Sequence, residues 1–260
     1  VVGDITTTTP IETLRIGKLR IRFSIEKTKS GTPNQGEISI FNLNPENRSK
    51  LQDAKSLSLS AGYVGSLKTI YTAQISNVET KKEGPDIITR LICGDGISFL
   101  ALSANKSYAP GSGVRDIIND LFRLAKLSDP GIAVDNLDII ENETMKNGFI
   151  VSGSIKDSID SLLKDQGLEM SIQDGKVQII KRGQQVNITK VLLDKTTGLV
   201  GRPEKLEGGG IKFSSLLNGE IFPGRLIEIR SDSVNGTFIA EKTPYVGDTR
   251  GDDWHIRDAE

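Results

Sequence analysis

Residues 197–230 constrain the fold of this chain more than any other stretch. A strand is predicted over 211–217, and the Asn-Gly pair that follows it favours a tight corner. A Pro-Gly turn at 223–224 then leads into a second strand with alternating apolar residues. Glycines fall where turns are needed, and no acid, base or nucleophile is placed to act on a substrate. The stretch therefore predicts a rigid corner of a β-barrel that supports contacts with neighbouring molecules.

The length and charge of the chain exclude several classes of protein. Its 260 residues suffice for two or three compact domains. The formal net charge of -1 lacks the basic excess that supports general nucleic-acid binding. No apolar run approaches the roughly 18 residues of a membrane helix, and the N-terminus shows no signal-peptide pattern. We therefore expect no membrane span. Because Cys93 is the single cysteine, the chain has no internal disulfide, which fits synthesis in a reducing cytoplasm.

Short strands separated by turns dominate residues 1–103, which we predict to be the first domain. Apolar and polar residues alternate strictly over 19–25, which indicates a strand with one buried face. An Asn-Pro pair predicts a short helix over 44–52. Together these elements favour a small antiparallel barrel or sandwich. Further strands are expected over 38–43, 57–63, 70–78 and 87–93.

Residues 104–183 form the second predicted domain, which is of the α+β type. Its polar, turn-rich beginning at 104–113 is interpreted as a boundary. Apolar residues recur at helical spacing over 114–125, and Ser154 caps a second helix that ends at Gly167. Two strands then flank an Asp-Gly pair, which is the strongest hairpin signal in the chain.

Residues 184–260 form the third predicted domain, a C-terminal β-barrel. An apolar strand is expected over 188–193, and an Asn-Gly pair at 235–236 predicts a second hairpin corner. The fold class is therefore α+β and mainly β, with two small barrels on either side of an α/β domain.

The loop before Trp254 holds the residues that most resemble a metal site. Asp-rich loops can bind calcium, but this one lacks the ordered ligand spacing of an EF-hand. A solvated loop anchored by Trp254 is the simpler interpretation, so we expect no metal and no cofactor, although the sequence leaves an ion in this loop open. The Arg-Gly-Asp tripeptide at 250–252 is interpreted as a chance match. The possible ligands are Asp248, Asp252, Asp253, His255 and Asp258.

Four helical carboxylates are the remaining candidates for catalysis. Paired carboxylates can hydrolyse glycosides, but these lie on predicted solvated helix faces. Glycine-rich turns at 94–96 and 208–210 lack the Lys-Ser/Thr of a phosphate-binding loop. Cys93 is expected to be a small buried apolar residue. We therefore predict no enzymatic activity and no catalytic residue. The four carboxylates are Asp116, Asp120, Asp157 and Asp160.

Several motifs, in this order, resemble the baseplate and tail hub proteins of tailed bacteriophages, of the myophage type. The segments NLNPENR, LSAGY and IYTAQI, which begin at 42, 59 and 70, resemble their first barrel and, more distantly, the tail-tube fold. The capped helix and hairpin of 154–179 resemble the module between their two barrels. TGL-G-PE at 197–204 and GDTRGDDWHI at 247–256 resemble the last barrel, where a loop leads into a final strand with a half-buried Trp.

The resemblance implies a structural protein of the virion, placed at the centre of the phage tail baseplate. Three chains with two tail-tube-like barrels each then offer six positions to the tail tube and a threefold socket to the central spike. The implied partners are further copies of the chain, a tail tube or distal tube protein and the spike, with the tape measure protein as a further candidate. DNA passes through the lumen during genome ejection without specific binding, so we expect polar or acidic faces around the ring.

Two other functions remain open on the sequence. A receptor- or carbohydrate-binding tail module would use aromatic platforms, whereas aromatic residues make up only 5% of this chain; binding to immobilised glycans would favour this function. A tail-associated peptidoglycan hydrolase would need a catalytic constellation that the residues do not offer, and cleared bands in a zymogram would favour it.

Overall fold

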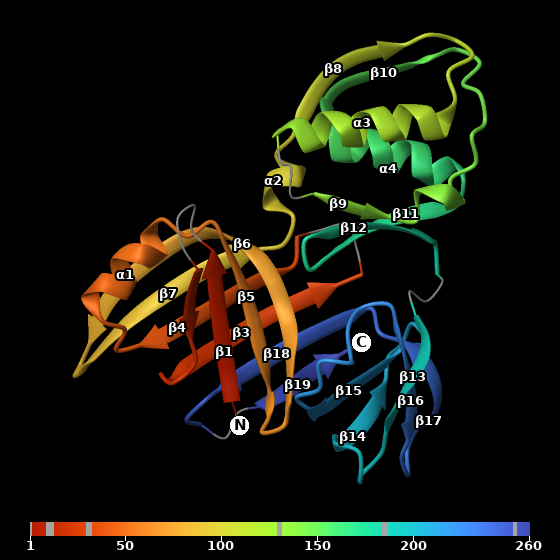
Figure 1. Cartoon of the computed structure of the whole chain (residues 1–260). Coiled ribbons are helices and arrows are strands. Elements are labelled where there is room, and N and C mark those ends of the chain that lie inside the picture. The colour runs from red at the N-terminus through yellow and green to blue at the C-terminus, as the bar shows by residue number, and fades with distance from the viewer. Residues whose placement is uncertain (1, 9–12, 30–32, 129–131, 184–186, 252–253) are drawn as a thin grey trace. The chain divides into compact units, whose positions relative to one another are not determined.

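The structure is a computed structural model that describes residues 2–8, 13–29, 33–128, 132–183, 187–251 and 254–260 (Figure 1). The chain divides into two compact units, which we call the β unit and the α/β unit. The β unit comprises Val1–Lys29, Asn34–Gly94 and Gln185–Glu260, and the α/β unit comprises Ser30–Pro33 and Asp95–Gln184. The β unit therefore combines both ends of the chain, whereas the α/β unit is nearly continuous in sequence.

One eleven-stranded sheet forms most of the β unit. A second sheet holds β13 (Asn187–Leu193), β16 (Arg225–Arg230) and β17 (Asn235–Ile239). One helix, α1 (Pro45–Gln52), belongs to the unit. In spatial order the large sheet runs β14 (Leu199–Lys205), β15 (Ile211–Leu216), β19 (Trp254–Ala259), β18 (Lys242–Asp248), β3 (Ile21–Thr28), β4 (Gln35–Phe41), β7 (Asp86–Gly94), β6 (Ser66–Glu83), β5 (Ser56–Tyr63), β1 (Val2–Thr8) and β2 (Thr13–Ile16).

The pairing of β18 with β3 joins the two ends of the chain into one sheet. Opposite Phe23 on β3 stands Gly247 on β18, and a Cβ at that glycine would come within 2.4 Å of the Phe23 ring. The same ring lies edge-on to the indole of Trp254, with 5.8 Å between ring centroids. Because apolar side chains from both ends share this core, the β unit needs residues more than 200 positions apart to complete it.

The α/β unit packs two helices against short strands. Ser154 accepts a hydrogen bond from the backbone N–H of Asp157 at 3.1 Å, which caps α4. Phe99 and Phe122 stack in its core with 5.9 Å between ring centroids. Its elements are α2 (Ile97–Leu100), β8 (Ser103–Tyr108), α3 (Val114–Ser128), β9 (Ala133–Asp135), a 3-10 turn (Leu137–Ile139), β10 (Phe149–Ser154), α4 (Ile155–Asp165), β11 (Leu168–Gln173) and β12 (Lys176–Lys181).

The structure confirms the mainly β character of the chain and the predicted helices over 44–52 and 114–125. The Asp-Gly hairpin between β11 and β12 is also confirmed. Asn44 caps α1, since its side-chain oxygen accepts the N–H of Asn47 at 2.7 Å. No closed barrel is found among the described strands, so the two separate barrels stay a prediction.

The polar stretch after 103, interpreted above as a boundary, contains strand β8, whose alternate side chains are half-buried against β10 and α3. Two local expectations differ from the structure. The corner between β16 and β17 lies at 231–234, where Ser231 and Val234 exchange hydrogen bonds, so Asn235 and the glycine after it already belong to β17. Strands β15 and β16 belong to different sheets, so the Asn-Gly corner between them is not a hairpin.

Candidate assembly surfaces

In the described part of the Asp-rich C-terminal loop, arginine side chains hold Asp248. Asp248 accepts hydrogen bonds from Arg20 at 2.7 and 3.0 Å and from Arg22 at 3.3 Å. These guanidinium groups, with Arg20 first, lower the pKa of Asp248 to about 2. His255 accepts the N–H of Trp254 at 3.2 Å, and Asp258 pairs with a lysine. Asp252 and Asp253 lie outside the described residues, and within the described part no three possible ligands lie together.

The Trp in this region is more deeply buried than the resemblance implies. The loop leads into a final strand, β19, and Trp254 begins that strand with 4% of its surface exposed. The edge-on contact with Phe23 accounts for this burial, because the indole reaches the core shared by both ends of the chain.

The four helical carboxylates do not converge on a common point. Asp120 is held by Lys106, by the hydroxyl of Tyr108 at 2.7 Å and by Arg123 at 2.7 Å. These donors hold its pKa well below its usual range. Asp116 accepts a hydrogen bond from Asn142 at the start of α3. On the other helix, Lys156 pairs with Asp160 at 2.7 Å and lies 3.9 Å from Asp157. Each carboxylate therefore has a local structural contact.

Cys93 and the glycine-rich turns serve the fold as well. Burial raises the pKa of the Cys93 thiol to about 12, so the reactive thiolate is disfavoured. Gly96 has a φ of 74° and lies against Ile172, where a Cβ would come within 2.8 Å. Asp95 accepts the backbone N–H of Gly175 at 2.8 Å and so fixes the hairpin between β11 and β12.

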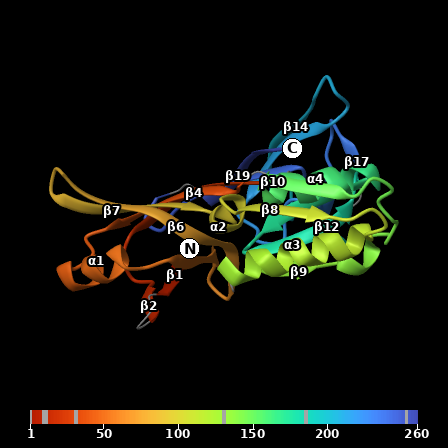
Figure 2. The same ribbon diagram turned by 90° about the horizontal axis from the view of Figure 1, so that it is seen from above.

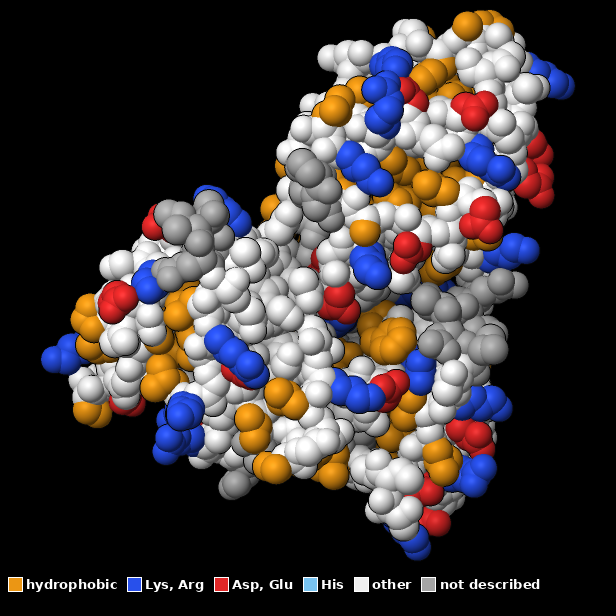
Figure 3. Space-filling model, viewed as in Figure 1, with side chains coloured by type: hydrophobic (Ala, Val, Ile, Leu, Met, Phe, Trp, Pro, Cys, Tyr) orange, Lys and Arg blue, Asp and Glu red, His pale blue; other side chains and the backbone are white. Residues whose placement is uncertain are grey.

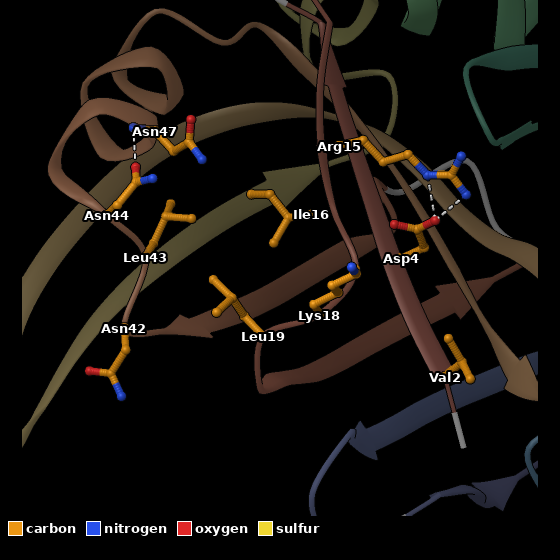
Figure 4. Close-up of a pocket in the computed structure, with 11 residues that line it drawn as sticks. Val2, Asp4, Arg15, Ile16, Lys18, Leu19, Asn42, Leu43, Asn44 and Asn47 are labelled. Carbon is orange, nitrogen blue, oxygen red and sulfur yellow. Dashed lines mark hydrogen bonds and ion pairs between the residues drawn. The ribbon is translucent and has the colours of Figure 1, made fainter.

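A pocket of the β unit lies beside the β1–β2 hairpin and has a volume of about 620 Å³ (Figure 4). Leu19 and Leu43 give it apolar walls, and the N-cap Asn44 lies on its rim. Its carboxylate, Asp4, is paired with Arg15, whose Nε donates at 2.6 Å. Among the described lining residues there is no second carboxylate and no histidine.

Besides the terminal strand β2, which pairs only with β1, two described strands of the large sheet present unpaired backbone edges. Strand β5 follows β6 only as far as Gln74, and the hairpin of β6 and β7 continues to the pair Glu83 and Asp86. Along 76–83, no described strand covers the side of β6 away from β7; we call this the distal β6 edge. This hairpin projects beyond α1 (Figure 2). Such edges readily pair with strands of other molecules.

At the end of the sheet opposite β2, the described strands leave β14 paired only with β15. Its pairing is irregular between Val200 and Glu204, and Pro203 lies within that irregular part. A proline in an edge strand removes a backbone donor, so this edge can pair along only part of its length. We call it the β14 edge.

The sequence patterns did not reveal the distal β6 edge. Apolar alternation in that strand ends at Val78, where we predicted the strand to end, whereas the structure continues it to Glu83. The remaining signal was weak, because polar residues on a two-sided exposed hairpin show no periodicity. A Gly-Pro pair at 84–85, between the strands predicted over 70–78 and 87–93, marks the turn.

Charged side chains on the open face of the large sheet occur as cross-strand pairs. Glu37 on β4 pairs with Arg90 on β7 at 3.1 Å, and Glu26 on β3 pairs with Lys242 on β18 at 2.9 Å. On the visible face of the molecule, basic and acidic side chains are interspersed (Figure 3). Since neighbouring charges of opposite sign cancel at distances beyond a Debye length, most of this face has a weak field.

A second charge network joins the two ends of the chain within the β unit. Glu220, in the loop after β15, pairs with Lys68 on β6 and with Arg225 at 3.2 Å. Both cations, with Lys68 first, lower the pKa of Glu220. Beside it the β5–β6 turn exposes Val64, with 82% of its surface accessible. The turn between these strands therefore offers an apolar contact next to an ion-paired one.

The whole chain matches known tail proteins. A family model described as "Baseplate hub gp41" matches residues 5–258. The fold is similar to a tail protein from Neisseria meningitidis MC58, with a TM-score of 0.64 and 11% identity over 100% of this chain and 97% of that one. It is also similar to the 43 kDa tail protein of prophage MuSo2 from Shewanella oneidensis, with a TM-score of 0.66 and 8% identity over 99% and 96%.

A third similar structure comes from a secretion system. The E. coli c3393 protein, a component of the type VI secretion system that is structurally similar to the T4 tail proteins gp27 and gp5, has a TM-score of 0.63 and 12% identity over 92% of this chain and 72% of that one. No curated protein matches the sequence.

The match to the family model, together with a fold shared with tail proteins, defines a structural component of a phage baseplate. Since the family model covers nearly the whole sequence, the chain belongs to the baseplate hub gp41 family. The predicted resemblance to phage hub proteins is thereby confirmed. Membership implies a component of the virion tail. None of the described helices has the length and apolar composition of a membrane span.

Proposed function

We propose that three copies of this chain form a pseudo-sixfold ring at the centre of the phage baseplate, where it joins the tail tube to the central spike. The observation that carries this proposal is the internal likeness of the large sheet. The N-terminal strands β3, β4, β7 and β6 lie beside the C-terminal strands β18, β19, β15 and β14. Each set of four strands supplies one position of the ring, so three chains supply six.

The two sets of strands share a connectivity that supports this likeness. Each consists of two hairpins, β3–β4 with β6–β7 in the first set and β18–β19 with β14–β15 in the second. In both sets the second strand of one hairpin pairs with the second strand of the other, as β4 pairs with β7 and β19 with β15. Only the order of the two hairpins along the chain differs.

The direction of the strands favours closure of a ring. From β14 to β6 the sheet has eight strands, and every neighbouring pair is antiparallel. Because eight is even, the distal β6 edge of one copy runs antiparallel to the β14 edge of the next copy when copies repeat around an axis. A head-to-tail contact of this kind closes into a ring when its rotation fits. Closure would bury both edges and prevent open-ended aggregation.

The proposed ring also implies the size of its interfaces, its binding partners and the nature of its lumen. Its interfaces exceed roughly 2,000 Å² in total, as in obligate oligomers. It has no enzymatic role and binds the tail tube or distal tube protein on one side and the spike on the other, with the tape measure protein as a further candidate. DNA passes through the lumen without specific binding, and polar or acidic faces around the ring remain our expectation.

Native mass spectrometry and cysteine cross-linking test the proposal. We expect a trimer by mass, and a Cys93→Ser background carrying Thr80→Cys on β6 and Val200→Cys on β14 should give cross-linked dimers and trimers. A matched pair, Ser24→Cys with Val200→Cys, places one thiol on a central strand and should give none. A monomer at every concentration, or equal cross-linking by both pairs, would refute the ring.

A further inference from the structure

Among the described residues, a pocket on the open face of the large sheet is lined by three arginines and two carboxylates. It has a volume of about 440 Å³ and is lined by residues of β3, β4, β18 and β19, including Arg22, Ser24, Gly247 and Arg257. It lies in the part of the sheet where the two ends of the chain are joined. Two of its guanidinium groups, those of Arg20 and Arg22, share a single carboxylate.

Arg20 and Arg22 share one carboxylate. Arg20 binds Asp248 through Nε at 3.0 Å and through a terminal nitrogen at 2.7 Å, a bidentate contact. Asp248 is also bonded to the backbone N–H of Arg250 at 3.0 Å, and its side chain is only 8% exposed. The other carboxylate of the pocket, Glu37, pairs with Arg90 outside it. Both described carboxylates of the pocket therefore already have partners.

Arg22 is oriented with its terminal nitrogens free for a ligand. Its Nε donates to Asp248 at 3.3 Å, and its guanidinium lies over the ring of Phe41, 5.5 Å from the centroid. Asp248 thus holds the Nε edge of the Arg22 guanidinium, and the Phe41 ring lies against its flat face. Among the described residues its two terminal nitrogens have no hydrogen-bond partner, and the side chain is 57% exposed. A planar guanidinium held in this way is suited to bidentate binding of an oxyanion.

We propose that this pocket binds a small oxyanion, either a phosphate or a carboxylate, through the terminal nitrogens of Arg22. Arg257 on β19 also lines the pocket. The site is built before the ligand arrives, because Asp248 and Phe41 hold Arg22 in place, so little side-chain entropy is lost on binding. The proposal goes beyond the ring described above and does not depend on it.

Titration calorimetry of the full chain with sodium phosphate, against sodium chloride of equal ionic strength, tests the site. We expect saturable binding of phosphate, and Arg22→Gln should weaken it about tenfold or more, which is the loss of a charge-assisted bidentate contact. Arg22→Lys keeps the charge but cannot make the bidentate contact, so its affinity for phosphate should lie between those of the wild type and Arg22→Gln. Lys242→Gln removes the same charge from the same face and should leave the affinity unchanged.

A parallel titration with sodium acetate distinguishes the two sources of the oxyanion. Binding of acetate alone assigns the pocket to a carboxylate, such as a side chain of a partner protein, and binding of phosphate alone assigns it to a phosphate group. No heat above that of chloride for either anion, or equal affinity of the wild type and Arg22→Gln with circular dichroism unchanged, would overturn the proposal.

Discussion

The two units of this protein are specified by different kinds of interaction. The α/β unit is almost continuous, and its helices, caps and hairpin follow from residues close together in the sequence. The β unit depends on the pairing of β3 with β18, in which Ile25 lies opposite Tyr245. Contacts between distant segments form only after a large loss of chain entropy, so such a sheet folds as one long-range assembly. The comparison predicts that damage to the distant ends affects only the β unit.

Removal of residues 197–260 should have the largest effect. The truncated chain loses β18 and β19, which exposes the edge of β3 and opens the core around Phe23. We expect the cooperative unfolding transition of the β unit to disappear, while that of the α/β unit remains in thermal circular dichroism. Residues 95–184 expressed alone are the control, with the same remaining transition. Two intact transitions in the truncated chain would contradict the comparison.

Core truncations should separate the two units. Leu91 in the β unit and Leu121 in the α/β unit are each 0% exposed. Replacement of either by Ala should cost about 3 kcal/mol, from lost burial and the cavity left behind. In differential scanning calorimetry each change should lower only the transition of its own unit. A shift of both transitions by one substitution would show that the units unfold together.

The β unit should lose stability in acid through Asp248. Its pKa is lowered from 3.8 to about 2 in the folded protein, so its contribution is complete above about pH 5 and is lost as the pH falls through 3.8 towards 2. That contribution is about 2 kcal/mol by linkage. Asp248→Asn should lower stability at pH 7 and flatten the acid dependence, as measured by urea unfolding between pH 2 and 7. If the free energy of unfolding of Asp248→Asn fell with pH as steeply as that of the wild type, the contact between Asp248 and Arg20 would not be the acid-sensitive element.

Asp120 should have a smaller effect in the α/β unit. It ties β8 to α3 through Lys106 and Tyr108, but its side chain is 21% exposed and so partly screened. Asp120→Asn should cost about 1 kcal/mol at pH 7, because one charge-assisted contact becomes neutral. Hydrogen exchange of the β8 amides is the measurement, with Arg123→Gln on the exposed side of the same carboxylate as a milder control. Faster exchange in the β unit instead would contradict this assignment.

The smallest effect is expected for an exposed cross-strand pair. Lys242 pairs with Glu26 at 2.9 Å between β18 and β3, with both side chains well exposed. Lys242→Gln should cost at most about 0.5 kcal/mol, since solvent and salt screen such pairs. The measurement is chemical denaturation at low salt. If Lys242→Gln lowered the free energy of unfolding as much as Asp248→Asn does, exposed charge rather than the buried core would hold the two ends together.

The amino-acid sequence by itself determined the elements whose causes are local. The Asn-Pro start of α1, the Ser154 cap of α4, the turn of β11 and β12 and the strict alternation of β3 each act over a few residues. For that reason the mainly β class and the helices of the α/β unit could be predicted. The family resemblance depended on the order of such short motifs and was confirmed as well.

Only the tertiary structure decided which strands are neighbours. Periodicity tells which face of a strand is buried but not what pairs with its edges, so β18 beside β3 and the unpaired distal β6 edge were not foreseen. Nor could spacing in the chain show that Asp248 is held by Arg20 and Arg22, because 228 and 226 positions separate these residues from it. Side chains that far apart meet only when the whole sheet has formed.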